Sequence, residues 1–172
     1  NSYGNGAAMR ISPVAYVGRT QKEIQDLSET VTGVSHNHAE GLKGAEATAT
    51  AIFMAGRCAS KDEIKNRIAD EYYPLNFTLD GIRDSYSFTT DCQATVPQAI
   101  VAFLESTSFE DAIRNAVSLG GDSDTLAAIA GAIAEAYYGI PEQIKERALS
   151  YFDVELLSVY EEWVRFIKDR NQ

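Results

Sequence analysis

Apolar residues recur at helical spacing along most of this chain, and this periodicity limits the folds that are open to it. In four stretches the apolar side chains fall at positions i, i+3, i+4 and i+7, which is the pattern of a helix with one buried face. These stretches are residues 42–53, 109–117, 126–137 and 156–167. No segment shows a convincing alternation of apolar and polar residues, as a half-buried strand would. The sequence therefore predicts an all-α protein.

Signals for helix starts and ends agree with this fold class. Five segments fit or approximate a capping box, in which an N-cap oxygen and a side chain three residues later satisfy free backbone amides. They are residues 20–23, 37–40, 60–63, 95–98 and 108–111. Gly120 and Gly139 stand where helices are expected to end, and segment 74–90 is expected to be a loop with a short helix. Small residues between positions 127 and 136 predict a central helix that neighbours approach closely.

Length and composition predict one compact domain over residues 1–172. The hydrophobic fraction of 45% suits a globular protein, and the net charge of −10 argues against nucleic acid or an anionic membrane as the main partner. Two cysteines, Cys58 and Cys92, are too few for a disulfide framework, so reduced thiols in the cytoplasm are expected. No stretch is apolar for long enough to predict a membrane span.

The segment GGDSDT, residues 120–125, carries the strongest sign of chemistry. Asp122, Asp124 and the Thr125 hydroxyl offer three oxygen ligands of the kind that Mg²⁺ and Mn²⁺ prefer. The two preceding glycines would allow a tight turn. A second interpretation is that the aspartates only cap the following helix and complement its dipole, and the residues alone do not separate the two. An Asp-x-Asp phosphatase nucleophile would follow a buried strand, which is not predicted here.

Two further motifs are open to functional and structural interpretations. The glycines around Asn5 could expose backbone amides to a phosphate, although an ordinary Asn-Gly turn has the same sequence. His36 and His38 lie two residues apart, but no cysteine or third histidine lies nearby to complete a zinc site. A Cys92–His36 nucleophile pair has no support in the spacing, and Cys92 is expected to be structural.

Four segments together resemble the ADP-ribosylglycohydrolase family, the all-α hydrolases that release ADP-ribose from modified targets. The segments are SYGNGAAMRISP at 2–13, SHNHAEGLKGA at 35–45, CQATVPQAIVAFLES at 92–106 and AIRNAVSLGGDSDTLAAIAGAIAEAYYGIP at 112–141. They occur in the family's order and cover most of the chain. The resemblance implies a compact orthogonal bundle of many helices, incomplete at its N-terminal end.

The resemblance also implies roles for individual residues. Asp122, Asp124 and Thr125 would be ligands of a binuclear Mg²⁺ or Mn²⁺ site, with the two aspartates serving catalysis. The metals would anchor the terminal ribose while a metal-associated water attacks its anomeric carbon. The expected contacts of ADP-ribose are Ser2, Tyr3, Gly4, Asn5, Gly6 and His36.

One departure from the family pattern shapes the functional hypothesis. Family members carry an upstream segment with an acidic residue and a Thr-Asp-Asp-Thr stretch that supplies the other metal ligands, and this chain begins after the place of that segment. The resemblance therefore implies the C-terminal portion of a metal-dependent ADP-ribosyl hydrolase, which is expected to be weak or inactive alone. The alternative is a non-catalytic module that binds ADP-ribose or a related nucleotide. Self-association, or a second chain that supplies the missing acids, is a further expectation.

Overall fold

The computed structural model describes residues 1–170, and its regular secondary structure over this range is helical. The eleven helices are α1 Gly6–Met9, α2 Ser12–Val17, α3 Gln21–Gly33, α4 Ala39–Gly56, α5 Lys61–Glu71, α6 Leu79–Ile82, α7 Val96–Leu104, α8 Phe109–Ser118, α9 Ser123–Tyr138, α10 Glu142–Leu149 and α11 Val154–Arg170. Extended pairing within residues 1–170 is limited to one isolated antiparallel bridge between Gly4 and Asp91. The all-α prediction is confirmed, and α6 is the short helix expected in segment 74–90.

The helices fall into two compact units, which divide after Gly139. The first unit contains α1 to α9, and the second contains α10 and α11, neither of which fully buries a residue. Gly139 ends α9 with a φ of +75°, a left-handed conformation that favours glycine. The single domain expected over residues 1–172 stays a prediction, and its last two residues lie outside the described range. Within residues 1–170 no helix is long and apolar enough to span a bilayer.

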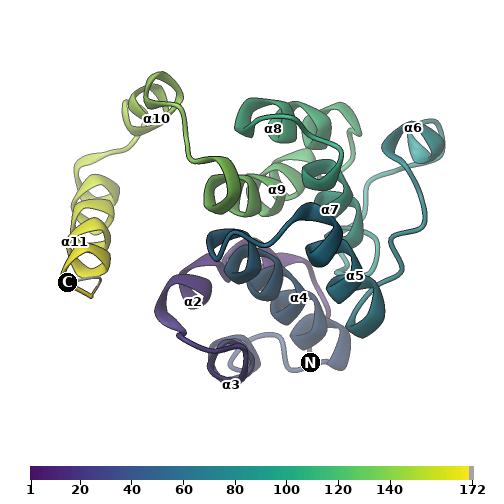
Figure 1. Cartoon of the computed structure of the whole chain (residues 1–172), viewed down its shortest axis with the longest axis horizontal. Coiled ribbons are helices and arrows are strands. Elements are labelled where there is room, and N and C mark those ends of the chain that lie inside the picture. The colour runs from purple at the N-terminus through teal and green to yellow at the C-terminus, as the bar shows by residue number, and fades with distance from the viewer. Residues whose placement is uncertain (171–172) are drawn as a thin grey trace. The chain divides into compact units, whose positions relative to one another are not determined.

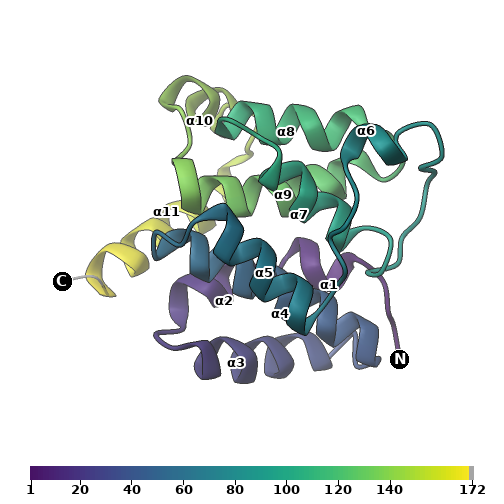
Figure 2. The ribbon, with the colours of Figure 1, turned by 45° about the vertical axis from the view of Figure 1, so that its right-hand side comes forward.

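Helices α4 and α9 form the centre of the first unit (Figure 1). Helix α4 packs against α1, α2, α3, α5, α7 and α9, while α9 also packs against α1, α7 and α8. Figure 2 shows α3 running alongside α4, and α8 alongside α9. Alanines and glycines on both central helices permit this close packing: a Cβ atom on Gly131 would lie 2.7 Å from Ile113 Cδ1. The expected central, small-residue helix is confirmed in α9.

Three of the five predicted helix starts have the expected cap. The Ser60 hydroxyl accepts a hydrogen bond from the Glu63 amide, and the Glu63 carboxylate accepts one from the Ser60 amide, which completes a capping box. The hydroxyls of Thr20 and Ser108 accept hydrogen bonds from the amides three residues later. These side chains fix where α3, α5 and α8 begin.

The other two starts differ from the prediction. Helix α4 begins one residue later than the 37–40 pattern implied, and its cap is His38, whose Nδ1 accepts a hydrogen bond from the Glu40 amide at 3.1 Å. An imidazole nitrogen here replaces the expected Asn37 oxygen. Thr95 precedes α7, but its hydroxyl caps no amide of that helix. It accepts a hydrogen bond from the Asn5 side chain instead.

Candidate functional site

Residues 2–6, here called the glycine loop, are held by a segment more than eighty residues away in the sequence. The Asn5 amide donates to the Thr90 carbonyl at 2.7 Å, and the Cys92 amide donates to the Tyr3 carbonyl at 3.1 Å. These two bonds fix the loop on both sides of Gly4. The Asn5 amide is therefore engaged by the protein, and the Gly4 amide donates to the Ser2 hydroxyl at 3.1 Å. A nest of wholly free amides, as the sequence allowed, is not formed.

His36 lies against the glycine loop. Its Nε2 atom is 3.3 Å from the position of a Cβ atom built on Gly6. Its Nδ1 atom is 2.8 Å from the Ser35 hydroxyl and 3.4 Å from the Arg10 guanidinium. Partial burial lowers the pKa of His36, and the positive charges of Arg10 and the N-terminus lower it further. A neutral imidazole and a guanidinium thus border the loop.

The Arg10 guanidinium is hydrogen-bonded to a backbone carbonyl and to His36. Its Nε atom donates to the Gly6 carbonyl at 2.5 Å, and its Nη2 atom faces His36. These two contacts involve a backbone carbonyl and an imidazole nitrogen. The positive charge is therefore left available beside the loop, which suits an anionic group.

Gly120 and Gly121 make the turn that leads into α9. Their φ angles of +73° and +63° lie in the left-handed region, which confirms the predicted tight turn. A Cβ atom on Gly121 would lie 2.9 Å from the ring of Tyr86, so this tyrosine covers the turn. The Tyr86 hydroxyl donates to the Ala94 carbonyl at 3.0 Å, which holds the ring in place.

Tyr86 is a site residue that the sequence reasoning missed. It lies in an irregular segment without periodicity, and its only sequence signal is a large aromatic side chain among turn residues. Burial raises the pKa of Tyr86, and the negative charges of Asp122 and Asp91 raise it further. The tyrosine therefore stays a neutral hydroxyl beside the aspartate.

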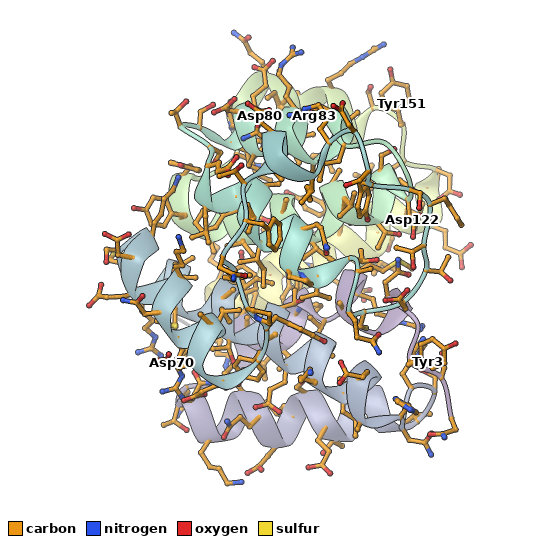
Figure 3. The ribbon with its side chains drawn as sticks, turned by 90° about the vertical axis from the view of Figure 1, so that its right-hand side faces the viewer. Tyr3, Asp70, Asp80, Arg83, Asp122 and Tyr151 are labelled. Atoms are coloured by element: carbon orange, nitrogen blue, oxygen red, sulfur yellow. The ribbon has the colours of Figure 1, made fainter. Side chains whose placement is uncertain are left out.

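Asp122 occupies the N-cap position of α9 but does not cap the helix. Its side chain forms no hydrogen bond to the backbone amides of the first turn. Its Oδ2 atom instead accepts a hydrogen bond from Asn5 Nδ2 at 2.6 Å, which joins the α9 start to the glycine loop. Asp122 and Tyr3 lie toward the same edge of the molecule in Figure 3. The capping interpretation of Asp122 is wrong.

Asp124 and Thr125 complete the set of predicted oxygen donors. Asp124 is exposed in the first turn of α9, and Thr125 is buried, with its hydroxyl donating to Met9 Sδ at 3.7 Å. Carboxylates and a hydroxyl are donors of the kind that a hard divalent cation takes. Within residues 1–170 no three side chains of His, Cys, Asp or Glu cluster as a metal site. The donors fit Mg²⁺ or Mn²⁺ in kind, and a cation held by them would need further ligands.

Cys92 is a structural residue, as expected. Its side chain is fully buried, and its Sγ atom donates to the Gly4 carbonyl at 3.3 Å. Burial raises the pKa of Cys92 to about 12, with further contributions from the charges of Asp91 and Glu40. A thiol with this pKa stays protonated near neutral pH and does not act as a nucleophile.

A labelling experiment checks this assignment. At pH 8 we expect an alkylating reagent to modify Cys58, which is exposed, and to leave Cys92 unmodified in the folded protein. The pKa of Cys92 in the folded protein, about 12, lies above that of a thiol in the unfolded chain. The Cys92 thiolate therefore forms in the folded protein only as the pH approaches 12. Mass spectrometry after labelling with and without urea gives the number of modified cysteines in the unfolded and the folded protein. Two rapidly labelled cysteines in the native protein would contradict the assignment.

The chain matches one family of known proteins along most of its length. The model of the family described as ADP-ribosylglycohydrolase matches residues 1–164. ADP-ribosylhydrolase ARH3 of Homo sapiens is 27% identical over 91% of this chain and 57% of its own length. ADP-ribosylarginine hydrolase Tri1 of Pseudomonas putida is 28% identical over 86% of this chain and 43% of its own.

The fold of the chain is also similar to that of a solved structure. The chain is similar, with a TM-score of 0.66 and 27% identity, to a structure described as an ADP-ribosylglycohydrolase-related protein complex. The match covers 81% of this chain and 52% of the other. The chain thus spans about half the length of the relatives that it matches.

Proposed function

Because the chain belongs to the ADP-ribosylglycohydrolase family, we propose that it serves the metal-dependent hydrolysis of a glycosidic bond to ADP-ribose. The observation that carries the proposal is the carboxylate of Asp122. It stands at a helix start without capping it, and it is bonded to Asn5 of the glycine loop. Asp122 thus lies near Asp124 and Thr125 in the sequence and is also hydrogen-bonded to the loop that is proposed to hold the ligand.

The cation would be held by Asp122, Asp124 and Thr125. The two aspartates repel each other in the absence of a counter-charge, and a divalent cation would offset this repulsion. When bound, Mg²⁺ or Mn²⁺ supplies Lewis-acid polarisation and orients the ribose and water. Water and substrate oxygens would provide further ligands, as they commonly do for Mg²⁺.

The diphosphate and the adjoining ribose would lie along the glycine loop. Within the loop, Ser2 and Gly6 are partly exposed, and Tyr3 is 53% exposed. His36, held neutral, can donate or accept one hydrogen bond to the ligand according to its tautomer. Arg10 adds a positive charge beside Gly6, which favours an anionic ligand in a chain of net charge −10.

A second candidate function is a non-catalytic module that binds ADP-ribose. One observation favours it: the glycine loop is already held by bonds from residues 90–92, whereas the cation donors supply only part of a shell. A pre-organised ligand loop needs little further ordering to bind. Cation-dependent turnover distinguishes the two functions.

Calorimetry and a turnover assay test the proposal. We expect ADP-ribose to bind with micromolar affinity and more tightly with Mn²⁺ present, while AMP, which lacks the diphosphate and terminal ribose, binds more weakly. Release of ADP-ribose from modified arginine and serine peptides is expected to be slow and to stop when EDTA is added. Binding without turnover would favour the module, and absence of binding by the folded protein would overturn both functions.

A further inference from the structure

Asn5 lies in the glycine loop, but its side chain points into the protein. Only 6% of the residue is exposed. The side-chain amide donates to Asp122 Oδ2 at 2.6 Å and to Thr95 Oγ1 at 3.1 Å, so both acceptors are protein groups. A side chain committed in this way does not reach a ligand on the loop surface. The ligand-contact role that the family resemblance implied for Asn5 therefore does not fit its side chain.

The backbone of Asn5 is fixed as firmly as its side chain. Its amide donates to Thr90, and its carbonyl accepts from Ala8 at 2.9 Å and from Met9 at 3.1 Å. Thr95, the second acceptor, is fully buried. The amide group of Asn5 is thus held in one orientation by groups of the protein itself.

The Asp122 carboxylate is hydrogen-bonded to Asn5 and not to the amides of its own helix. An aspartate at an N-cap position ordinarily turns back to accept a hydrogen bond from the second or third amide of the helix. Here Asp122 makes no such bond. A carboxylate has two oxygens that can each accept more than one bond, so engagement of Oδ2 leaves Oδ1 free for a cation.

We propose that Asn5 is a positioning residue, which turns the Asp122 carboxylate away from the helix amides and toward the divalent cation. This inference rests on the proposed function, because it concerns the same cation. Groups that orient a ligand by hydrogen bonding typically change metal affinity by about 10–100-fold when they are removed. Since Asn5 also belongs to the glycine loop, it connects the cation site to the loop that holds ADP-ribose.

Two variants, each of nearly the same shape as the residue that it replaces, distinguish a positioning role of Asn5 from a merely structural one. Asn5→Leu removes both donors, whereas Thr95→Val removes the second acceptor, together with its side-chain hydrogen bond with Tyr86, and leaves the Asp122 bond in place. Mn²⁺ affinity, measured by electron paramagnetic resonance, is expected to fall by about 10–100-fold in Asn5→Leu. It should change less than about twofold in Thr95→Val. Equal affinity in Asn5→Leu and the wild type would overturn the inference.

A measurement without metal keeps the inference testable if Asn5→Leu does not fold. In the metal-free wild type, the Asn5 side-chain amide should give a distinct signal in a ¹H–¹⁵N spectrum. We expect this signal to move in Asp122→Ala and to stay in place in Asp124→Ala. No response to Asp122→Ala would overturn the inference. If the signal responds but the wild type binds no Mn²⁺, the cation part of the proposed function fails and the positioning of Asp122 by Asn5 stands.

Discussion

Replacing Asp122 and Asp124 together with asparagine is expected to abolish measurable binding of Mn²⁺. Two anionic ligands become neutral amides of nearly the same size, so the fold is preserved while the attraction for the cation is lost. The loss should exceed about a hundredfold, since removal of an outer hydrogen-bond partner alone typically costs about 10–100-fold. Titration of Mn²⁺ by electron paramagnetic resonance measures this loss, and calorimetry shows whether ADP-ribose still binds the glycine loop.

The chain offers a matched control in α5. Asp62 stands at the second position of that helix, as Asp124 does in α9, so Asp62→Asn removes the same interaction with a helix dipole. We expect Asp62→Asn to bind Mn²⁺ like the wild type. If the double variant also keeps wild-type affinity, the aspartates of α9 are not cation ligands and the metal-dependent function is wrong.

Replacing Gly44 with alanine is expected to destabilise the protein and to displace the glycine loop. A Cβ atom there would lie 2.6 Å from Cys92 Sγ and 2.7 Å from Cys92 Cβ. Cys92 cannot move away easily, because it is fully buried and bonded to Tyr3 and Gly4. Overpacking of this kind typically costs about 1–3 kcal/mol, which exceeds the roughly 0.5–1 kcal/mol that alanine gains over glycine in a helix. Urea unfolding measures the net change.

Two other glycines serve as controls for this substitution. Gly33 has no atom within 4 Å of an added Cβ, so Gly33→Ala should be neutral or slightly stabilising. A Cβ atom on Gly131 would meet only the end of the flexible Ile113 side chain. The stability of Gly131→Ala should therefore lie between the stabilities of Gly44→Ala and Gly33→Ala. A Gly44→Ala variant as stable as Gly33→Ala, with unchanged ADP-ribose affinity, would show that the Gly44–Cys92 contact does not support the loop.

Local features of the site could be read from the sequence because they depend on neighbouring residues. Glycines at 120 and 121 predicted a tight turn, and the Asp and Thr residues that follow predicted oxygen donors at a helix start. The apolar spacing after Leu126 predicted the buried face of α9. Each of these signals lies within one or two helical turns of the residue that it describes.

Other features depend on contacts between distant segments, and the sequence did not reveal them. The Asn5–Asp122 hydrogen bond joins residues 117 positions apart, so no spacing rule distinguished a capping aspartate from one turned toward the loop. Tyr86 covers the Gly121 turn from an irregular segment in which no periodicity indicates its neighbours. His38 became the cap of α4 because its imidazole nitrogen reached the Glu40 amide, which pattern rules for hydroxyl and carboxylate caps do not cover.

Segment 86–91 contacts both parts of the site, through Tyr86 at Gly121 and through Thr90 at Asn5. Connections between helices usually tolerate added residues, because few contacts depend on their length. The length of segment 86–91 is constrained, because an extra residue between Tyr86 and Thr90 would displace either the Tyr86–Gly121 contact or the Thr90–Asn5 hydrogen bond. Among related chains, we expect insertions to gather in segment 74–85 and to be rare in these six positions.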